Sequence, residues 1–152
     1  MMKKSNKAII FVYNANSGTK NGLLDSAHKI FSPKTYECNL CDLTYGLLSE
    51  NRKWKAFRKE TDMEFVFLHK DDYQKNFKSK FESLYELPVI LFQDNYELSL
   101  LMSNKELNEI EEVEVLIEKV KSRIWSIIPG FDWYSGYNLE YHLFQFYEQK
   151  RS

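Results

Sequence analysis

Lys7-Ala8-Ile9-Ile10-Phe11-Val12-Tyr13 is a nearly continuous run of apolar, β-branched and aromatic residues. A run without polar alternation is typical of a strand that is buried on both faces in the middle of a sheet. A polar loop with two glycines, Asn14–Gly22, follows it. Apolar residues at helical spacing then predict a helix over about 21–31, which Ser32-Pro33 ends. The opening of the chain therefore predicts a central strand followed by a crossover helix.

Three more strands are predicted further along the chain. Glu64–Leu68 is a second apolar and aromatic run. Leu87–Phe92 and Glu97–Met102 predict two strands that form a hairpin around a turn at Gln93–Tyr96. Between the second and third strands, four residues recur along one face of a predicted helix: Tyr73, Phe77, Phe81 and Leu84.

Short polar motifs mark where helices begin. Asp71 and Asp72 are candidate caps for the helix that follows the second strand. Ser103-Asn104-Lys105-Glu106 has the pattern of a capping box, and it predicts a helical region that runs to about Ile124. The acidic run Glu109–Glu114 is a candidate break within that region.

The composition is that of one globular domain. The chain has 152 residues, 43% of them hydrophobic, and a formal net charge of −1. No apolar run approaches the roughly 20 residues that span a bilayer, and the apolar run Ala8–Tyr13 lacks a leader-type cleavage site. We therefore expect a cytoplasmic protein whose partners are neither nucleic acid nor a membrane.

The only two cysteines lie in the segment Tyr36–Gly46, spaced Cys-x-x-Cys. Cys38 and Cys41 could close a small disulfide ring or supply half of a tetrahedral metal site. In the cytoplasm such a pair is more often redox-active or metal-binding than a structural disulfide. The segment and a helical pattern over Leu47–Arg58 form a predicted insertion over about 33–60.

A zinc site would need two more ligands than the cysteine pair provides. His28 lies on the predicted helix before the pair, and His69 ends the second strand. A Cys38, Cys41, His28 and His69 set is therefore one prediction. The alternative is that the cysteines and histidines only pack inside the domain.

The predicted order, β-α-β-α-β-β-α with the insertion set aside, resembles the thioredoxin/glutaredoxin-like superfamily. Leu87-Pro88-Val89 lies where that superfamily places its cis-proline strand. The resemblance covers about Ala8–Ile124. It implies a thioredoxin-like domain over 1–125, with a four-stranded mixed sheet and a cis peptide bond at Pro88.

The cysteines depart from the pattern of that superfamily. Thioredoxin-like enzymes carry the nucleophilic cysteine in the loop after the first strand, at the start of the next helix. The corresponding loop here, Asn14–Gly22, has no cysteine. Redox chemistry by Cys38 and Cys41 would therefore use an unusual position.

A second resemblance comes from the motif Tyr-x-Cys-x-Leu-Cys-x-Leu-Thr-Tyr-Gly over 36–46, with Phe-Val-Tyr-Asn-Ala-x-Ser-Gly over 11–18. Both are similar to a family of small uncharacterised bacterial proteins, some loosely labelled GTPases. Ser17-Gly18-Thr19-Lys20 lacks the spacing of a P-loop, and Asn104-Lys105-Glu106-Leu107 does not complete a guanine-binding motif. The residues therefore do not predict GTPase activity.

The loop after the first strand is a candidate ligand site. It follows the carboxyl end of a central strand, the usual place for a small ligand in an open α/β sheet. If Pro88 is cis and faces the loop, the two form a shallow cleft; a solvated turn is the alternative. The candidate binding residues are Asn14, Asn16, Ser17, Thr19, Lys20 and Pro88.

Residues 126–152 form an aromatic C-terminal extension, with eight rings between Phe131 and Tyr147. So many rings are expected to be covered, either by the domain or by a second copy in a homodimer. Few basic residues stand among them, which disfavours binding of single-stranded nucleic acid.

Three functions remain open on the sequence alone. The first is thiol–disulfide redox chemistry at Cys38 and Cys41, with a protein or small thiol as the partner. The second is a zinc-binding structural domain. The third is a binding module without enzymatic activity that uses the Asn14–Gly22 loop or the aromatic extension.

Overall fold

A four-stranded mixed sheet forms the centre of the protein. In the computed structural model, which describes residues 6–16, 38–46, 49–81 and 85–133, the sheet has the order β2-β1-β3-β4. Its strands are β1 (Lys7–Val12), β2 (Glu64–Leu68), β3 (Val89–Asp94) and β4 (Glu97–Met102).

β1 is the inner strand on which the sheet is built. It pairs in parallel with β2, where Ile10 lies opposite Val66, and antiparallel with β3, where Ile10 lies opposite Leu91. From Ala8 to Val12 its residues are at most 5% exposed. The prediction of a strand buried on both faces is therefore confirmed.

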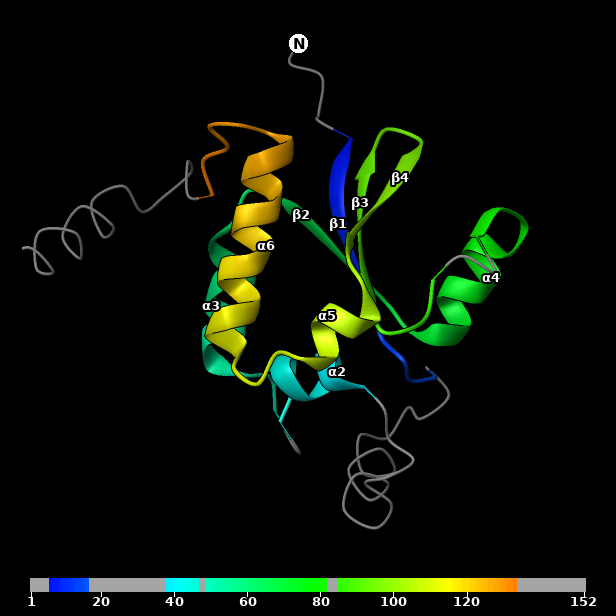
Figure 1. Cartoon of the computed structure of the whole chain (residues 1–152), viewed down its shortest axis with the longest axis horizontal. Helices are drawn as coiled ribbons and strands as arrows, with labels where there is room; N and C mark the ends of the chain where they lie inside the picture. The colour runs from blue at the N-terminus through cyan, green and yellow to red at the C-terminus, as the bar shows by residue number, and fades with distance from the viewer. Residues whose placement is uncertain (1–5, 17–37, 47–48, 82–84, 134–152) are drawn as a thin grey trace, which may run out of the picture.

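Helices cover both faces of the sheet. α3 (Arg52–Glu60) and α6 (Val113–Ile127) lie on one face, and α4 (Lys70–Phe81) lies on the other (Figure 1). Two short helices, α2 (Asn39–Thr44) and α5 (Asn104–Asn108), sit near one end of the sheet and contact each other. The fold is thus a three-layer α/β arrangement.

The larger core lies between the sheet and the α3/α6 layer. Trp54 of α3 is fully buried, and its ring meets Phe11 of β1 edge-to-face at a centroid distance of 5.2 Å. Phe57 and Phe65 pack against the same indole. The indole Nε1 has no hydrogen-bond partner among the described residues, so Trp54 stabilises the core through packing alone.

A smaller core fills the face beneath α4. Ile10, Val12, Val89 and Leu91 from β1 and β3 pack there with Tyr73 of α4. The alternating side chains of a strand point to opposite faces of the sheet, so β1 contributes to both cores at once.

Most predicted elements are found at or near their predicted positions. The second and fourth strands match, and the third is shifted to Val89–Asp94. The hairpin turns at Asn95, whose φ of 57° lies in the left-handed region that asparagine tolerates. Ser103 and Glu106 form the predicted capping box, and the helical region breaks after Asn108 and resumes at Val113.

Other predictions are wrong or fall outside the described residues. α4 begins at Lys70, so Asp71 and Asp72 lie in its first turn and do not cap it. α2 was not predicted, because its six residues are too few to show helical periodicity. α3 begins at Arg52, later than the predicted Leu47. The predicted helix over 21–31 lies outside the described part of the chain.

Only the start of the aromatic extension is described. The ring of Trp133 lies 5.4 Å from Phe57 of α3 and 4.9 Å from Phe131, and Trp133 is buried. The first rings of the extension therefore pack on the domain. The arrangement of residues 134–152, and the homodimer expected from them, stay predictions.

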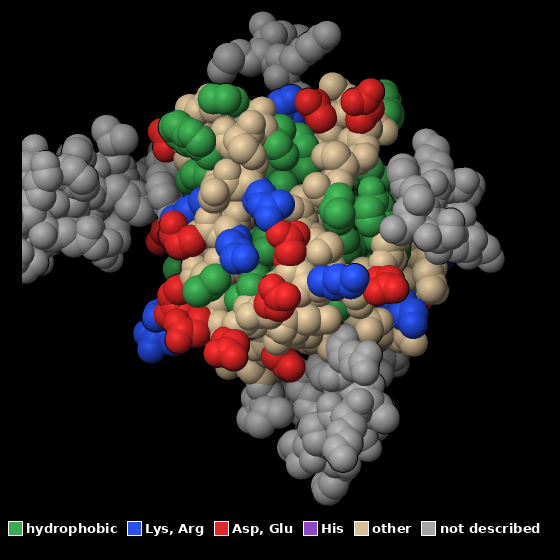
Figure 2. Space-filling view, in the orientation of Figure 1, with side chains coloured by type: hydrophobic (Ala, Val, Ile, Leu, Met, Phe, Trp, Pro, Cys, Tyr) green, Lys and Arg blue, Asp and Glu red, His purple; other side chains and the backbone are tan. Residues whose placement is uncertain are grey.

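Charges of both signs are mixed on the face that carries α5 and α6 (Figure 2). Arg123 pairs there with Glu106, and Lys53 of α3 pairs with Glu114. Within the described ranges, no helix is long and apolar enough to cross a bilayer.

Truncating Trp54 should destabilise the domain strongly. Trp54→Ala is expected to lower the free energy of unfolding by about 3–5 kcal/mol, because it leaves a large cavity among packed rings. Trp125 is 56% exposed, so Trp125→Ala should change the free energy of unfolding by less than about 0.5 kcal/mol. Urea unfolding followed by circular dichroism measures both; equal losses would contradict this account of the core.

A candidate redox site at Cys38 and Cys41

The site lies beside the edge of the sheet where β1 and β2 end. Tyr13 directly follows β1, and its backbone N–H donates to the Leu68 carbonyl at 2.9 Å. The β1–β3 register, continued by one residue from Val12 and Val89, places Pro88 opposite Tyr13. The Leu87–Pro88 peptide bond is cis, as the resemblance implies.

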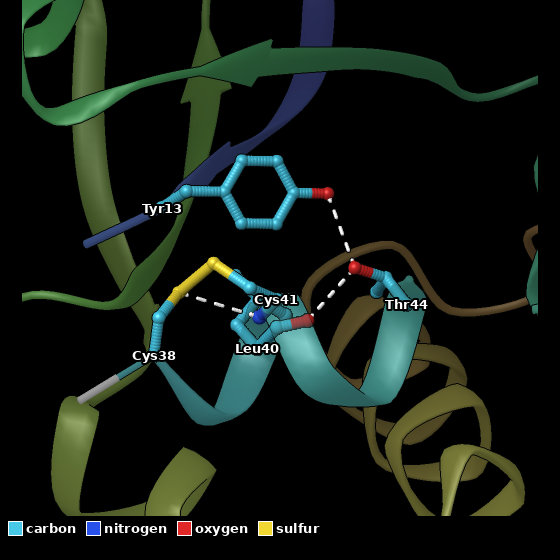
Figure 3. Close-up of a disulfide and its surroundings, with 5 residues drawn as sticks. All are labelled: Tyr13, Cys38, Leu40, Cys41 and Thr44. Atoms are coloured by element: carbon cyan, nitrogen blue, oxygen red, sulfur yellow. Dashed lines mark hydrogen bonds between the residues drawn. A yellow bond between two sulfur atoms is a disulfide. The ribbon is translucent and has the colours of Figure 1, made fainter. Parts of the chain in front are cut away.

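Cys38 and Cys41 form a disulfide at the start of α2, with an S–S distance of 2.00 Å. Cys38 is the residue before the helix, and its Sγ accepts a hydrogen bond from the backbone N–H of Cys41 at 3.3 Å. Both residues are buried, with 1% of Cys38 and 7% of Cys41 exposed. Cys38 therefore caps α2, and both cysteines belong to the larger core. Figure 3 shows the disulfide at the start of the helix.

A chain of two hydrogen bonds fixes the side chains around the disulfide. Thr44 Oγ1 donates its single proton to the Leu40 carbonyl at 2.8 Å. The hydroxyl of Tyr13 lies 3.3 Å from Thr44 Oγ1, and because the threonine proton is already used, Tyr13 is the donor. Figure 3 shows the Tyr13 ring beside the disulfide, with its hydroxyl directed at Thr44 and away from the sulfurs.

Burial keeps Tyr13 neutral. Removal of the phenol from water raises the pKa of Tyr13 well above its ordinary value of 10. Tyr13 therefore carries its proton at neutral pH and cannot act as a base toward either cysteine.

Asn39 ties α2 to the break between α5 and α6. Its amide Nδ2 donates to the carbonyl of Leu107 and, at 2.8 Å, to the carbonyl of Ile110. These carbonyls lie at the end of α5 and in the turn that follows it, and the Leu107 carbonyl also accepts the backbone N–H of Ile110 at 3.3 Å. The disulfide is thus held on a short helix that is fixed at both faces, by Tyr13 and by Asn39.

The segment after α2 is also fixed. Tyr45 forms a β-bridge with Glu50, and the Glu50 carboxylate accepts two hydrogen bonds from Arg58, at 2.8 and 2.9 Å. The hydrogen bond with Glu50 raises the pKa of the Arg58 guanidinium. This bidentate pair joins the end of the cysteine segment to α3.

The predicted zinc ligands are only partly brought together. His69 is exposed; its Nδ1 lies 3.6 Å from Asp72, and its ring is 6.1 Å from Tyr13. His28 lies outside the described residues. In the described ranges, no group of three or more histidine, cysteine or acidic side chains is placed to hold a metal. In the disulfide form, neither cysteine offers a thiolate ligand.

The predicted ligand loop is described only at its start. Asn14 and Asn16 lie within the described residues, whereas Ser17, Thr19 and Lys20 lie outside them. Asn14 lines a cavity on the α4 face together with Leu87, the residue before Pro88. The part of the cleft that can be described therefore opens toward α4 and not toward the disulfide.

Sequence reasoning missed three residues that position the cysteine pair. Tyr13 was interpreted only as the end of a strand, and Thr44 and Asn39 only as members of a motif. The one available signal was the spacing of Thr44. Thr44 is four residues after Leu40, a spacing at which a threonine hydroxyl can bond to the backbone carbonyl. Asn39 had no such local signal, because its carbonyl partners lie far away in the sequence.

No protein-family model, curated protein or solved structure matches this chain. The function must therefore be argued from the described residues themselves.

The Tyr13–Thr44 hydrogen bond should show strong coupling in a double-mutant cycle. Thr44→Val leaves the buried phenol without its acceptor and is expected to cost about 1–3 kcal/mol of unfolding free energy. In the Tyr13→Phe background the same change should cost clearly less, because no donor is left unsatisfied. Equal costs in the two backgrounds would show that the bond does not form.

Tyr13 should also make the protein sensitive to alkali. A pKa raised in the folded state means that the unfolded chain loses the proton first, so the stability from this group is complete below pH 10 and falls above it. The slope is at most about 1.4 kcal/mol per pH unit. The unfolding temperature should therefore fall less steeply with rising pH in Tyr13→Phe than in the unsubstituted protein. The range to measure is about pH 9 to pH 11, roughly one unit either side of the unfolded pKa.

Proposed function

We propose that the protein carries out thiol–disulfide redox chemistry through Cys38 and Cys41, on a thioredoxin-like domain with an aromatic C-terminal extension. The observation that carries the proposal is the disulfide itself, placed at the start of α2 next to Tyr13. A pair that closes a ring across two intervening residues can open and close again with little change in the rest of the chain.

The sheet supports the thioredoxin-like part of the proposal. It is a four-stranded mixed sheet, as the resemblance implies, with a parallel β1–β2 pair and an antiparallel β3–β4 hairpin. The cysteines come late in the sequence, yet Cys38 and Cys41 share a core cluster with Tyr13, the first residue after β1. The cysteine pair is therefore close in space to the end of the central strand, although its place in the sequence differs from that in the superfamily.

The two cysteines take different roles in the proposed exchange. Both cysteines are buried, but the Cys41 residue is 7% exposed and the Cys38 residue 1%, which favours Cys41 as the point of attack. Cys38 Sγ already accepts the Cys41 N–H, and the same donor stabilises a thiolate on Cys38 after the bond breaks. Cys41 is therefore the sulfur that joins the partner, and Cys38 is the leaving and resolving sulfur.

The exchange balances with a thiol as the only co-reactant. The partner thiolate attacks Cys41 Sγ, a mixed disulfide forms, and the electron pair of the broken bond stays on Cys38 as a thiolate. A second partner thiolate then attacks the partner sulfur of the mixed disulfide and releases Cys41 as a thiolate. The protein is reduced by two electrons, and two partner thiols become one disulfide. The partner is a small thiol or a cysteine of another protein.

Single serine variants should trap the partner at one position only. With Cys38→Ser the resolving sulfur is absent, so incubation with oxidised glutathione should leave a stable mixed disulfide on Cys41. Cys41→Ser should form far less adduct under the same conditions, because the remaining sulfur is the more deeply buried one. Intact-mass spectrometry measures the occupancy of each adduct.

The unfolding temperature of each serine variant serves as the control for folding. Equal adduct on both variants would contradict the assigned roles. No adduct on either folded variant would contradict redox exchange itself.

A further inference from the structure

A cavity of about 260 Å³ lies on the α4 side of the sheet, away from the disulfide. It is lined by α4 residues, among them Lys70 and Tyr73, and by the segment Tyr85–Leu87 that leads into β3. Its apolar lining belongs to the smaller core beneath α4, whereas both cysteines belong to the larger one. The cavity is therefore independent of the redox site.

Tyr73 lines this cavity, and its hydroxyl is an unsatisfied donor within the described part of the chain. The residue is only 5% exposed, and its hydroxyl is buried with no hydrogen-bond partner among the described residues. Its ring is held by Phe77, at a centroid distance of 5.4 Å. Burial raises the pKa of Tyr73, with a smaller contribution from Tyr85, so the hydroxyl keeps its proton. A buried donor of this kind is unfavourable unless an acceptor arrives.

Two opposite charges also line the cavity. Lys70 supplies an ammonium group that makes no ion pair within the described residues, and Glu86 supplies a carboxylate. One oxygen of Glu86, Oε2, accepts a hydrogen bond from Asn104 Nδ2 at 2.9 Å, so the other remains for a ligand. Glu86 would repel a simple anion, and Lys70 would repel a simple cation. A ligand with both charges satisfies both side chains.

We propose that this cavity binds a free α-amino acid with an apolar side chain. The ligand carboxylate accepts from the Tyr73 hydroxyl and pairs with Lys70, and the ligand ammonium pairs with Glu86. The side chain of the ligand packs on the apolar part of the lining, formed by Phe77, Tyr85 and Leu87. The volume is slightly below the roughly 300–1,000 Å³ of drug-sized pockets, which suits a molecule of this size.

The first test compares three probes on the full chain by ¹H–¹⁵N NMR titration. L-Phenylalanine should shift signals of α4 and of the Tyr85–Leu87 segment. 3-Phenylpropionate, which lacks the ammonium, and phenethylamine, which lacks the carboxylate, should each bind at least about tenfold more weakly, the usual effect of one lost charged hydrogen bond. Equal binding of either truncated probe would overturn the proposal, as would no shift with about 10 mM L-phenylalanine, far above a 1 mM dissociation constant.

The second test separates the Tyr73 hydroxyl from the packing of its ring. Tyr73→Phe keeps the ring, so the unfolding temperature should be unchanged or higher because a buried donor is removed. Binding of L-phenylalanine should weaken at least about tenfold. Tyr96→Phe is the matched control, since Tyr96 is 94% exposed on the hairpin turn. Unchanged binding in Tyr73→Phe, or an equal loss in Tyr96→Phe, would overturn the proposal.

Discussion

The burial of β1 on both faces is the constraint on which the rest of the structure depends. Phe11 faces the aromatic core under α3 and α6, while Ile10 and Val12 face the core under α4. Helices are needed on both sides of such a strand, because neither face tolerates water. Tyr13, the first residue after the strand, connects β1 to the cysteine segment through its hydrogen bond with Thr44.

Side-chain hydrogen bonds hold the helix that carries the disulfide in place beside the sheet. Tyr13 holds α2 from the sheet side, and Asn39 holds it from the α5–α6 turn. The disulfide ring therefore lies on a short helix that hydrogen bonds hold on two sides. The exchange proposed for this pair requires that both its oxidised and its reduced states be folded. A separate cavity lies on the α4 face of the sheet.

The sequence predicted the sheet well and the site poorly, for physical reasons. Strands such as β1 and β2 are dense apolar runs, and the capping box at Ser103 is a local pattern, so both can be identified in one segment. The hydrogen bond from Tyr13 to Thr44 joins residues 31 positions apart, and Asn39 bonds to Leu107 across 68 positions. The Tyr73 cavity likewise arises only when α4 packs against the segment before β3. Long-range contacts of this kind leave no periodic signal.

Reversible opening of the Cys38–Cys41 bond is the central claim. The most direct measurement is a thiol and zinc count on one freshly purified, untagged preparation, equilibrated over a range of glutathione redox ratios. We predict no titratable thiol in the oxidised protein, two in the reduced protein, a return to none on reoxidation, and no bound zinc. About one zinc per chain with no reactive thiol, or two thiols that never reform the bond, would contradict the account.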